Sequence, residues 1–418
     1  MANGKKLGIT ALTLIGLCLG IITGIIFYAL PENYFLDTFL VEGVFYVLGN
    51  GFIKLLKMIV VPLVFVSLVS GTMAIGDVKK LGKIGVKTVA FYLATTTLAI
   101  VVALTVANVI KPGIGLDMAN LTVADVTVAE KTPLTTTFLN LIPDNPIGAM
   151  ANGDMIPIIV FAIFVGVGIL TIGSEGDVVS KFFIQFNEVM LKITLMVMKV
   201  APIGVFALVA RTFANLGFSA FSSLIKYMAS VLLGLGIQAI IVYSLMLFIF
   251  TKLNPLKFIR KFVPIATFAF STASSNATIP VSIDTLEKNM GISRKISSFT
   301  IPLGATINMD GTAIMQGVAV VFTAQAFGIV LTGGDYLTVI LTATLASIGT
   351  AGVPGVGLVM LSMVLTSIGL PVEAIGIIMG IDRILDMTRT AVNVMGDAVC
   401  TTIVAMKEND IDLEIYNS

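Results

Sequence analysis

Five polar residues recur at helical spacing near the C-terminal end of an otherwise apolar chain. They are Asp382, Asp386, Arg389, Asn393 and Asp397. At 100° per residue they fall within a sector of about 80°, so they form one narrow stripe along a helix. Ionisable side chains inside an apolar segment are costly, which predicts that the stripe faces an interior site or pathway. Three carboxylates against one arginine leave a negative charge that requires a cation. A self-neutralising network that only joins helices is the alternative.

A second polar cluster interrupts the preceding apolar segment. It runs Gly304-Ala-Thr-Ile-Asn308-Met-Asp310-Gly-Thr312. Asn and Asp next to Gly disfavour a regular helix, so we expect an unwound turn here, with a simple kink as the alternative. Backbone carbonyls released by such a turn, together with the Asp310 carboxylate, are oxygen ligands of the kind that bind Na⁺ in transporters.

A third group of oxygen-bearing side chains lies in the apolar segment 85–111. Tyr92, Thr95 and Thr96 would share one face of a helix there. Because Ser and Thr hydroxyls often bond back to their own helix, this pattern alone favours neither a ligand role nor a structural one.

The composition indicates what kind of protein positions these groups. Of 418 residues, 57% are hydrophobic and 12% are charged, against about 25% charged in an average soluble domain. A soluble globule cannot cover so much apolar surface, which predicts a polytopic membrane protein. The absence of histidine and the presence of only two cysteines disfavour a zinc site, a Ser-His-Asp hydrolase and a disulfide-stabilised secreted fold. The net charge of +1 gives no reason to expect a nucleic-acid partner.

Eight apolar segments are long enough to cross a bilayer, which takes about 20 residues. They lie near residues 7–30, 44–75, 85–111, 155–173, 182–213, 223–251, 296–330 and 372–406. Two more apolar segments, 256–290 and 336–369, are interrupted by polar residues, Gly and Pro. Lysine and arginine cluster in alternate loops, which predicts cytoplasmic N- and C-termini. This topology requires both interrupted segments to be re-entrant hairpins that open on opposite sides.

The two interrupted segments share a plan, in which a small, polar tip is followed by a proline. Asn308 follows Pro280 by 28 positions, and Asp382 follows Pro354 by the same 28 positions. Oppositely oriented hairpins at matched spacing predict an inverted repeat, and the broken elements of such repeats form transporter binding sites near the midplane. Two ordinary kinked hairpins are the alternative.

Together these motifs resemble the glutamate/aspartate transporter family, the dicarboxylate/amino acid:cation symporters. The resemblance covers essentially the whole chain and rests on the tip 271–280, Asn308-Met-Asp-Gly-Thr312, Ser347-Ile-Gly-Thr-Ala-Gly-Val-Pro-Gly355 and the C-terminal stripe. It implies a prokaryotic-type, all-α polytopic membrane protein with eight transmembrane helices, two re-entrant hairpins and an elevator-type transport mechanism.

The resemblance also implies a homotrimer in the lipid bilayer, divided into a scaffold and a mobile transport domain. The scaffold would comprise residues 1–78, with spans one and two, and 112–216, with spans four and five and an outer loop. The transport domain would comprise span three in 79–111 and residues 217–418, with both hairpins.

The implied function is Na⁺-coupled symport of L-aspartate or L-glutamate across an inner cell membrane, with several Na⁺ ions, no organic cofactor and no enzymatic activity. A proton-coupled symporter is the first alternative. A Na⁺-coupled carrier of neutral amino acids would not need Arg389, and a C4-dicarboxylate carrier would not need Asp386. An intramembrane aspartyl protease built on Asp310 and Asp386 would leave the hairpin repeat unexplained.

By this resemblance, Arg389 would bind the substrate side-chain carboxylate, Asp386 its ammonium group and Asn393 its α-carboxylate. A planar guanidinium suits that task because it can pair with a carboxylate through two hydrogen bonds. The other substrate contacts would be Thr312, Thr390, Ser275, Val353 and Gly357.

Three Na⁺ sites are implied in the same way. The first would use Gly304, Asn308, Asn393 and Asp397. The second would use Thr306, Ser347, Ile348 and Thr350. The third would use Tyr92, Thr95, Thr96, Asn308 and Asp310.

The chain departs from the family pattern at three positions. Relatives carry an additional arginine near the substrate, at positions that are Ala273 or Met387 here, and Asn276 stands where a serine is usual. The charge around Arg389 therefore differs from that pattern, which leaves the preference between aspartate and glutamate open.

Overall fold

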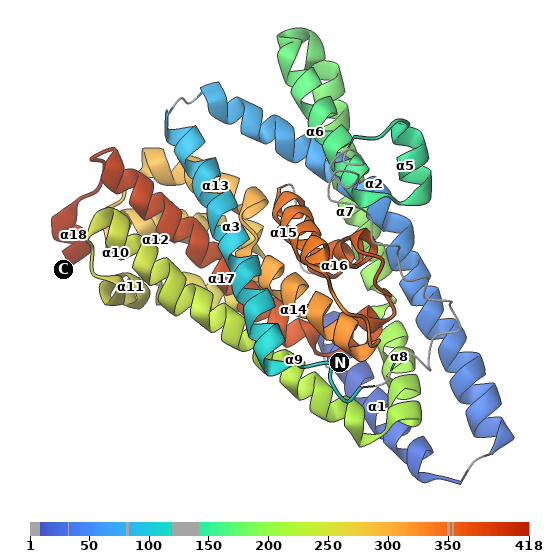
Figure 1. The fold of residues 1–418 in the computed structure, drawn as a ribbon. Helices are drawn as coiled ribbons and strands as arrows, with labels where there is room; N and C mark the ends of the chain where they lie inside the picture. Colours follow the sequence, from blue (N-terminus) through green and yellow to red (C-terminus); the bar gives the residue numbers. More distant parts are fainter. Residues whose placement is uncertain are drawn as a thin grey trace, which may run out of the picture.

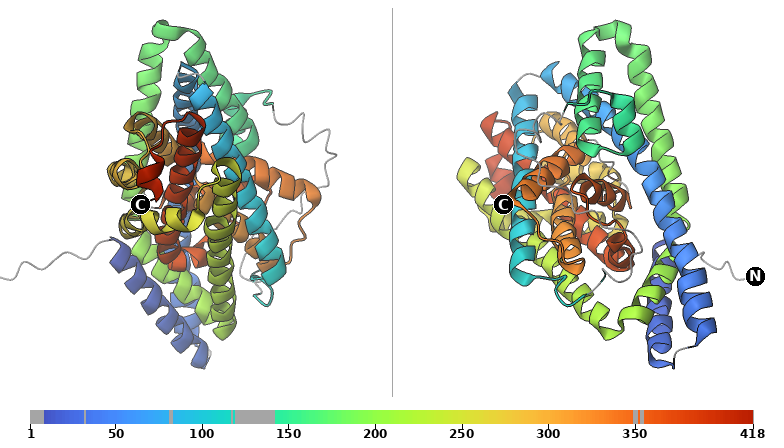
Figure 2. Two further views of the ribbon diagram at one scale, coloured as in Figure 1. Left: turned by 90° about the vertical axis from the view of Figure 1, so that its left-hand side faces the viewer. Right: turned by 45° about the vertical axis from the view of Figure 1, so that its right-hand side comes forward.

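The chain folds into helices that pack as two groups. The computed structural model describes residues 9–31, 33–80, 83–116, 118, 142–348, 352 and 355–417, and within these ranges it contains helices and no strand. Figures 1 and 2 show α1, α2 and α5 to α8 along one side of the molecule and α3 together with the C-terminal half of the chain on the other.

The first group is built from the N-terminal part of the chain. Its elements are α1 (Ile9–Ala29), the π-helical η1 (Phe35–Phe45), α2 (Tyr46–Lys80), α5 (Pro146–Asn152), α6 (Met155–Thr171), the 3-10 turn η3 (Gly173–Gly176), α7 (Asp177–Met198) and α8 (Ala201–Leu216). α2 packs against α6, α7 and α8, and α1 runs along α8. A Cβ atom on Gly16, Gly20 or Gly24 would lie within 3 Å of a backbone oxygen of α8. Small residues four apart therefore let α1 and α8 approach closely, as is common between helices in membranes.

The second group surrounds a long C-terminal helix. Its elements are α3 (Lys83–Ile110), α9 (Phe218–Gly236), the π-helical η4 (Ile237–Val242), α10 (Tyr243–Thr251), α11 (Pro255–Thr272), α12 (Ser275–Met290), α13 (Arg294–Ile307), α14 (Asp310–Ala326), α15 (Gly333–Ser347), α16 (Val356–Ser367), α17 (Ala374–Lys407) and α18 (Leu413–Asn417). α17 contacts α3, α9 and α10 as well as α11 to α14. Nearly every residue of α14 is buried, as expected for a helix at the centre of a group.

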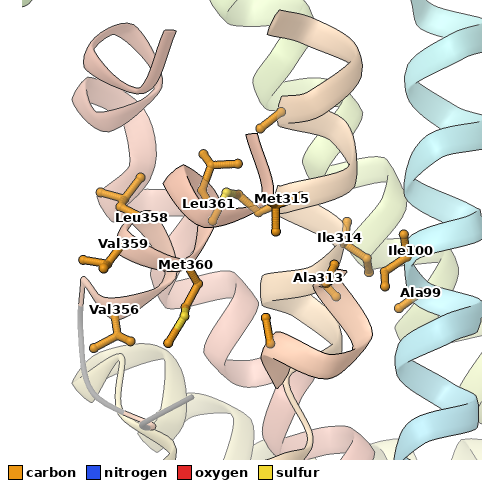
Figure 3. Close-up of a cluster of buried hydrophobic side chains, with 14 of the residues drawn as sticks. Ala99, Ile100, Ala313, Ile314, Met315, Val356, Leu358, Val359, Met360 and Leu361 are labelled. Atoms are coloured by element: carbon orange, nitrogen blue, oxygen red, sulfur yellow. The ribbon is translucent and has the colours of Figure 1, made fainter. Parts of the chain in front are cut away.

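An apolar cluster joins three of these helices. It consists of Ala99 and Ile100 of α3, Ala313 to Met315 of α14, and Val356 and Leu358 to Leu361 of α16, all buried (Figure 3). Figure 3 shows α14 between the other two helices. This packing holds α16 against α14, and so fixes one arm of the second hairpin beside the helix that begins at Asp310.

The predicted unwound turn in 296–330 is confirmed. α13 ends at Ile307, Asn308 is extended with φ −94° and ψ 98°, Met309 is non-helical, and α14 begins at Asp310. The break releases backbone groups in the interior of the second group, close to α17.

The predicted single span 182–213 is not a straight helix in the structure. α7 and α8 meet at a break around Lys199 and Val200 and are bent by 51°. Pro202 lies in the first turn of α8, where its missing N–H is tolerated; inside a continuous helix it would remove a hydrogen bond.

Three helical segments of the described chain are long and apolar enough to cross a membrane by length and composition. They are Phe35–Met73, Ile84–Ile110 and Phe221–Thr251, and the bent α7–α8 pair adds a fourth if it counts as one span. The other predicted spans do not pass this test among the described residues, so the eight-span topology stays a prediction.

Two helical hairpins occupy the predicted interrupted segments and meet at their tips. α11 and α12 are joined at Ala273, which adopts a left-handed conformation with φ 48°, and at Ser274, which caps α12. The Ser274 hydroxyl donates to the carbonyl of Gly352 at 2.8 Å, and the N–H of Asn276 lies 3.4 Å from the same oxygen. Gly352 belongs to the connection between α15 and α16, so the two tips are in direct contact.

The C-terminal segment is tied to the first hairpin. Tyr416 of α18 is fully buried and its hydroxyl donates to the Asn254 carbonyl at 3.1 Å. Lys261 of α11 donates to the carbonyls of Asn289 and Ile415, at 2.8 and 2.6 Å. These contacts join the tail to α11, and Lys261 also links α11 to α12.

Tyr416→Ala is expected to lower the free energy of unfolding by about 3–5 kcal/mol, because it empties a fully buried aromatic site. Tyr416→Phe removes only the hydroxyl bond and is expected to lower it by about 1 kcal/mol. Thermal and denaturant unfolding of the detergent-solubilised protein measures both.

The control for this prediction is Tyr34→Ala, since Tyr34 is 80% exposed and its truncation is expected to change little. Equal effects of Tyr416→Ala and Tyr34→Ala would contradict the docking of α18.

Candidate functional site

The polar stripe of α17 is buried and internally paired. Arg389 is 1% exposed, and Asp382, Asp386, Asn393 and Asp397 are buried as well. The Arg389 guanidinium donates to Asp382 Oδ1 at 2.5 Å and to Asp386 Oδ1 at 2.8 Å. Arg389 Nε is buried and has no hydrogen-bond partner among the described residues. The predicted stripe is therefore confirmed as a buried polar face. Its arginine pairs with Asp386 one turn earlier and with Asp382 two turns earlier.

Helix α14 begins directly against this arginine. A Cβ atom on Gly311 would lie 2.6 Å from the Arg389 carbonyl oxygen, so only glycine fits there without a shift. The Gly311 N–H donates to Asn393 Oδ1 at 2.7 Å, and Asn393 Nδ2 lies 3.5 Å from the Thr312 hydroxyl. A Cβ atom on Gly357 would lie 3.2 Å from Arg389 Nη2 and 3.3 Å from the Thr312 methyl carbon. The structure thus brings Arg389, Asn393, Thr312 and Gly357 together.

Two of the remaining predicted substrate contacts are described by the structure, Thr390 on the stripe and Ser275 at the first-hairpin tip. Thr390 donates back to the Asp386 carbonyl at 2.8 Å. Ser275 is buried at the start of α12. A Cβ atom added to Gly352 would lie 2.9 Å from the Cβ atom of Ser275. Val353 lies outside the described residues. The first-hairpin tip and the second-hairpin connection therefore approach each other, close to the Ala305 carbonyl of α13.

The residues predicted for the first cation site form one cluster. Asn308 Nδ2 donates to Asp397 Oδ1 at 2.8 Å and to the Asn393 carbonyl at 3.1 Å. A Cβ atom on Gly304 would clash with Asp397 Oδ1 and with the Tyr92 hydroxyl. All four predicted residues meet where the α13–α14 break faces α17.

The residues predicted for the third cation site surround Asp310. The Thr96 hydroxyl donates to Asp310 Oδ1 at 2.6 Å, and the Thr95 hydroxyl lies 3.5 Å from Asn308 Oδ1. The Tyr92 hydroxyl instead donates to the Thr300 carbonyl at 3.0 Å. The hydroxyl groups of the third predicted span, whose role the sequence left open, therefore face α13, α14 and the break between them.

The second predicted cation set is not assembled by any hydrogen bond among its described members. Thr306 donates to the Pro302 carbonyl at 3.3 Å and Ser347 to the Thr344 carbonyl at 2.7 Å, each within its own helix. The Ile348 N–H donates to the Leu345 carbonyl, and Thr350 lies outside the described residues.

Two residues that the sequence analysis did not single out bind the same carboxylate. The Tyr243 hydroxyl donates to Asp310 Oδ2 at 2.6 Å, and Gln238 Nε2 lies 3.3 Å from that oxygen. Their signal in the sequence is a glutamine inside the apolar run 223–251, five residues before a tyrosine. Residues five apart do not share one face of an α-helix. Gln238 and Tyr243 both reach Asp310 because η4 is π-helical.

The positions that depart from the family pattern provide no further cation. Ala273 is buried where α11 ends, and Met387 is half-buried on α17. Among the side chains that the structure describes, Arg389 supplies the positive charge next to Asp386.

The folded chain is similar to known carriers over almost its whole length. Residues 9–407 match the sodium:dicarboxylate symporter family. The chain is 38% identical to a proton/sodium-glutamate symport protein of Bacillus caldotenax, over 98% of this chain and 97% of the relative. It is 39% identical to a proton/glutamate-aspartate symporter of Escherichia coli (strain K12), over 87% and 85%. It is 34% identical to a C4-dicarboxylate transport protein of Bacillus subtilis (strain 168), over 87% and 88%.

These similarities and the buried polar site in an apolar helical fold define a membrane transporter, not an enzyme. The chain belongs to the sodium:dicarboxylate symporter family, which confirms the resemblance read from its motifs.

Arg389→Met is expected to lower the free energy of unfolding by about 3–5 kcal/mol, because Asp382 and Asp386 stay buried after their shared counter-charge is removed. Adding Asp382→Asn to that variant removes one of the two charges and is expected to recover part of the loss. Thermal unfolding in detergent at constant pH compares the single and double variants.

Arg294→Met is the matched control, since Arg294 pairs with Glu287 at the surface, where such pairs contribute about 0–1 kcal/mol. A double variant no more stable than Arg389→Met alone would argue against the ion-pair account.

Proposed function

We propose that this protein is a secondary active transporter that carries L-aspartate or L-glutamate together with Na⁺. The observation that carries the proposal is the buried pair of Arg389 and Asp386 beside the hairpin tips. An acidic amino acid presents a carboxylate at one end and an ammonium group at the other. Such a ligand replaces the 2.8 Å Arg389–Asp386 contact by two contacts of matching charge, so that neither buried group is left unpaired.

The substrate contacts in this proposal are those that the family resemblance implies, and the close approach of Asp386, Thr312 and Gly357 to Arg389 supports them. Arg389 binds the side-chain carboxylate, and its buried Nε–H adds a donor to those of the paired nitrogens. Asp386 binds the ammonium group, and Asn393 binds the α-carboxylate from one turn further along α17. Thr312, Thr390, Ser275, Val353 and Gly357 complete the pocket from α14, α17 and both hairpins.

The coupling ions in this proposal are Na⁺ at the three oxygen-rich sets. Carboxylate, carbonyl and hydroxyl oxygens suit a hard cation. Asp397 with Asn308, and Asp310 with Thr96, are the two carboxylate-containing sets that the contacts support. The second set, around Thr306, Ser347, Ile348 and Thr350, rests on the resemblance alone.

Proton coupling is the second candidate, because relatives are named proton/glutamate-aspartate and proton/sodium-glutamate symporters. C4-dicarboxylate transport is favoured less, since Asp386 beside Arg389 would repel a second carboxylate.

The transport step in this proposal is an elevator movement in a homotrimer of the inner membrane, with both termini cytoplasmic. The group containing α1, α2, α6, α7 and α8 acts as the scaffold, and the group around α17 moves. The packing of the helices into these two groups supports that division. Exposed Phe164, Phe182 and Leu245 suit a lipid or subunit contact.

In liposomes, uptake of labelled L-aspartate and L-glutamate is expected to require an inward Na⁺ gradient at equal pH on both sides. An excess of unlabelled L-aspartate should compete strongly and an excess of succinate weakly, because succinate lacks the ammonium group that Asp386 binds. Arg389→Lys keeps the charge but loses the planar fork, and is expected to reduce uptake at least tenfold.

Arg294→Lys is the matched control and should transport at the unmodified rate. Uptake driven by a pH gradient without Na⁺ would replace Na⁺ by H⁺ in the proposal. Uptake of serine or alanine in place of both acidic amino acids would overturn the role of Arg389.

A further inference from the structure

The burial of Gln238 and the lack of a partner for its side-chain oxygen are not explained by its contacts within the fold. It is fully buried, and its side-chain oxygen Oε1 has no hydrogen-bond partner among the described residues. Its nitrogen Nε2 makes two long contacts, 3.3 Å to Asp310 Oδ2 and 3.4 Å to the Thr95 carbonyl oxygen. Asp310 already accepts hydrogen bonds of 2.6 Å from both Thr96 and Tyr243. The carboxylate therefore does not depend on Gln238, while burial of the unpaired Oε1 opposes folding.

The helix is locally rearranged to bring Gln238 to this position. Residues five apart lie about 140° apart on an α-helix, so Gln238 and Tyr243 would point to different neighbours. In η4 the Tyr243 N–H donates to the Gln238 carbonyl, the i to i+5 bond of a π-helix. That bond lets both side chains reach Asp310. π-helical turns inside α-helices often mark functional sites.

The distances around Nε2 match those between neighbouring ligands of one cation. Two oxygens about 2.4 Å from a cation of the size of Na⁺ or Ca²⁺ lie about 3.4 Å apart when they subtend a right angle. The terminal torsion of glutamine is soft, and half a turn about it exchanges Oε1 and Nε2. Oε1 then takes the position 3.3 and 3.4 Å from Asp310 Oδ2 and the Thr95 carbonyl oxygen. Further oxygens lie on the same two partners, because the Thr96 hydroxyl bonds Asp310 Oδ1 and Asn308 Oδ1 lies 3.5 Å from the Thr95 hydroxyl.

We propose that Gln238 is a further ligand of the cation bound at Asp310, contributing Oε1 after its amide turns. This inference rests on the proposed cation coupling and adds a residue from the sixth predicted span to the third predicted Na⁺ set. In this arrangement, Gln238 links the position of η4, and of α9 before it, to the binding of the cation between α3 and α14.

The test compares two substitutions that separate the acceptor from the donor. Gln238→Met keeps the length of the side chain but removes both the oxygen and the nitrogen. Gln238→Glu keeps oxygen and removes the N–H donor. In purified protein, the melting temperature by far-UV circular dichroism is recorded against Na⁺ concentration, with choline keeping the ionic strength constant. The Na⁺ concentration that gives half of the stabilisation reports cation binding without transport.

If Oε1 is a ligand, Gln238→Met should raise that concentration at least tenfold, while Gln238→Glu should stay within threefold of the unmodified protein or fall below it. If Gln238 acts only as an N–H donor, the order reverses, because Gln238→Glu loses the donor and sets a second carboxylate beside Asp310. Thr323→Val is the matched control: the Thr323 hydroxyl is another buried group without a partner in the described chain, on the same helix as Asp310. Its Na⁺ dependence should not change.

The outcomes separate this inference from the function on which it rests. A Gln238→Met midpoint within twofold of the unmodified protein, or a larger shift in Gln238→Glu than in Gln238→Met, overturns the ligand role and leaves Na⁺ coupling intact. An unmodified protein that Na⁺ does not stabilise overturns both. If Gln238→Met yields no folded protein, the Na⁺ midpoint of Gln238→Glu decides alone. A midpoint within threefold of the unmodified protein or below it supports the ligand role, and a higher midpoint overturns it.

Discussion

The need to neutralise Arg389 inside an apolar fold shapes the structure around it. A guanidinium that is 1% exposed must be paired, because an uncompensated buried charge destabilises a fold by several kcal/mol. Asp382 and Asp386 meet that need from the same helix, so α17 carries a buried polar face. The other elements approach this face with glycines, Gly311 from α14 and Gly357 from α16. The candidate site is thus the place where close backbone approaches and the buried charges coincide.

The break between α13 and α14 links the oxygen-rich sets to that charged face. Asn308 is the central residue, since its amide nitrogen donates to Asp397 and to the Asn393 carbonyl while its oxygen lies beside the Thr95 hydroxyl. Asn393 in turn accepts from the Gly311 N–H and lies one turn from Arg389. A cation bound at either set therefore acts on residues that border the proposed substrate contacts. Asn308 and Asn393 thus connect the proposed ion sites directly to the proposed substrate contacts.

The hairpins depend on each other at the same place. Ser274 and Gly352 are joined by a hydrogen bond, and α16 is held against α14 and α3 by apolar packing (Figure 3). A movement of the second tip away from the first would break that hydrogen bond while leaving the apolar cluster intact. The described tip residues are thus joined through the Gly352 carbonyl, whereas α16 behind them is held by apolar packing.

The sequence by itself determined the class of protein, the polar face of α17, the unwound turn at Asn308 and the family. The first three features follow from composition and from spacing within one segment, and the family follows from the resemblance of the motifs. None of these depends on how segments pack. It did not determine that Thr96 faces Asp310, that α7 and α8 form an angle, or that Gln238 and Tyr243 reach one carboxylate. Those outcomes were decided by the tertiary structure, because each depends on a contact between distant segments or on a π-helical turn that changes the angular spacing. A hydroxyl on a helix can bond to its own backbone or to a neighbour with little difference in local energy, so only the packed neighbour settles which of the two occurs.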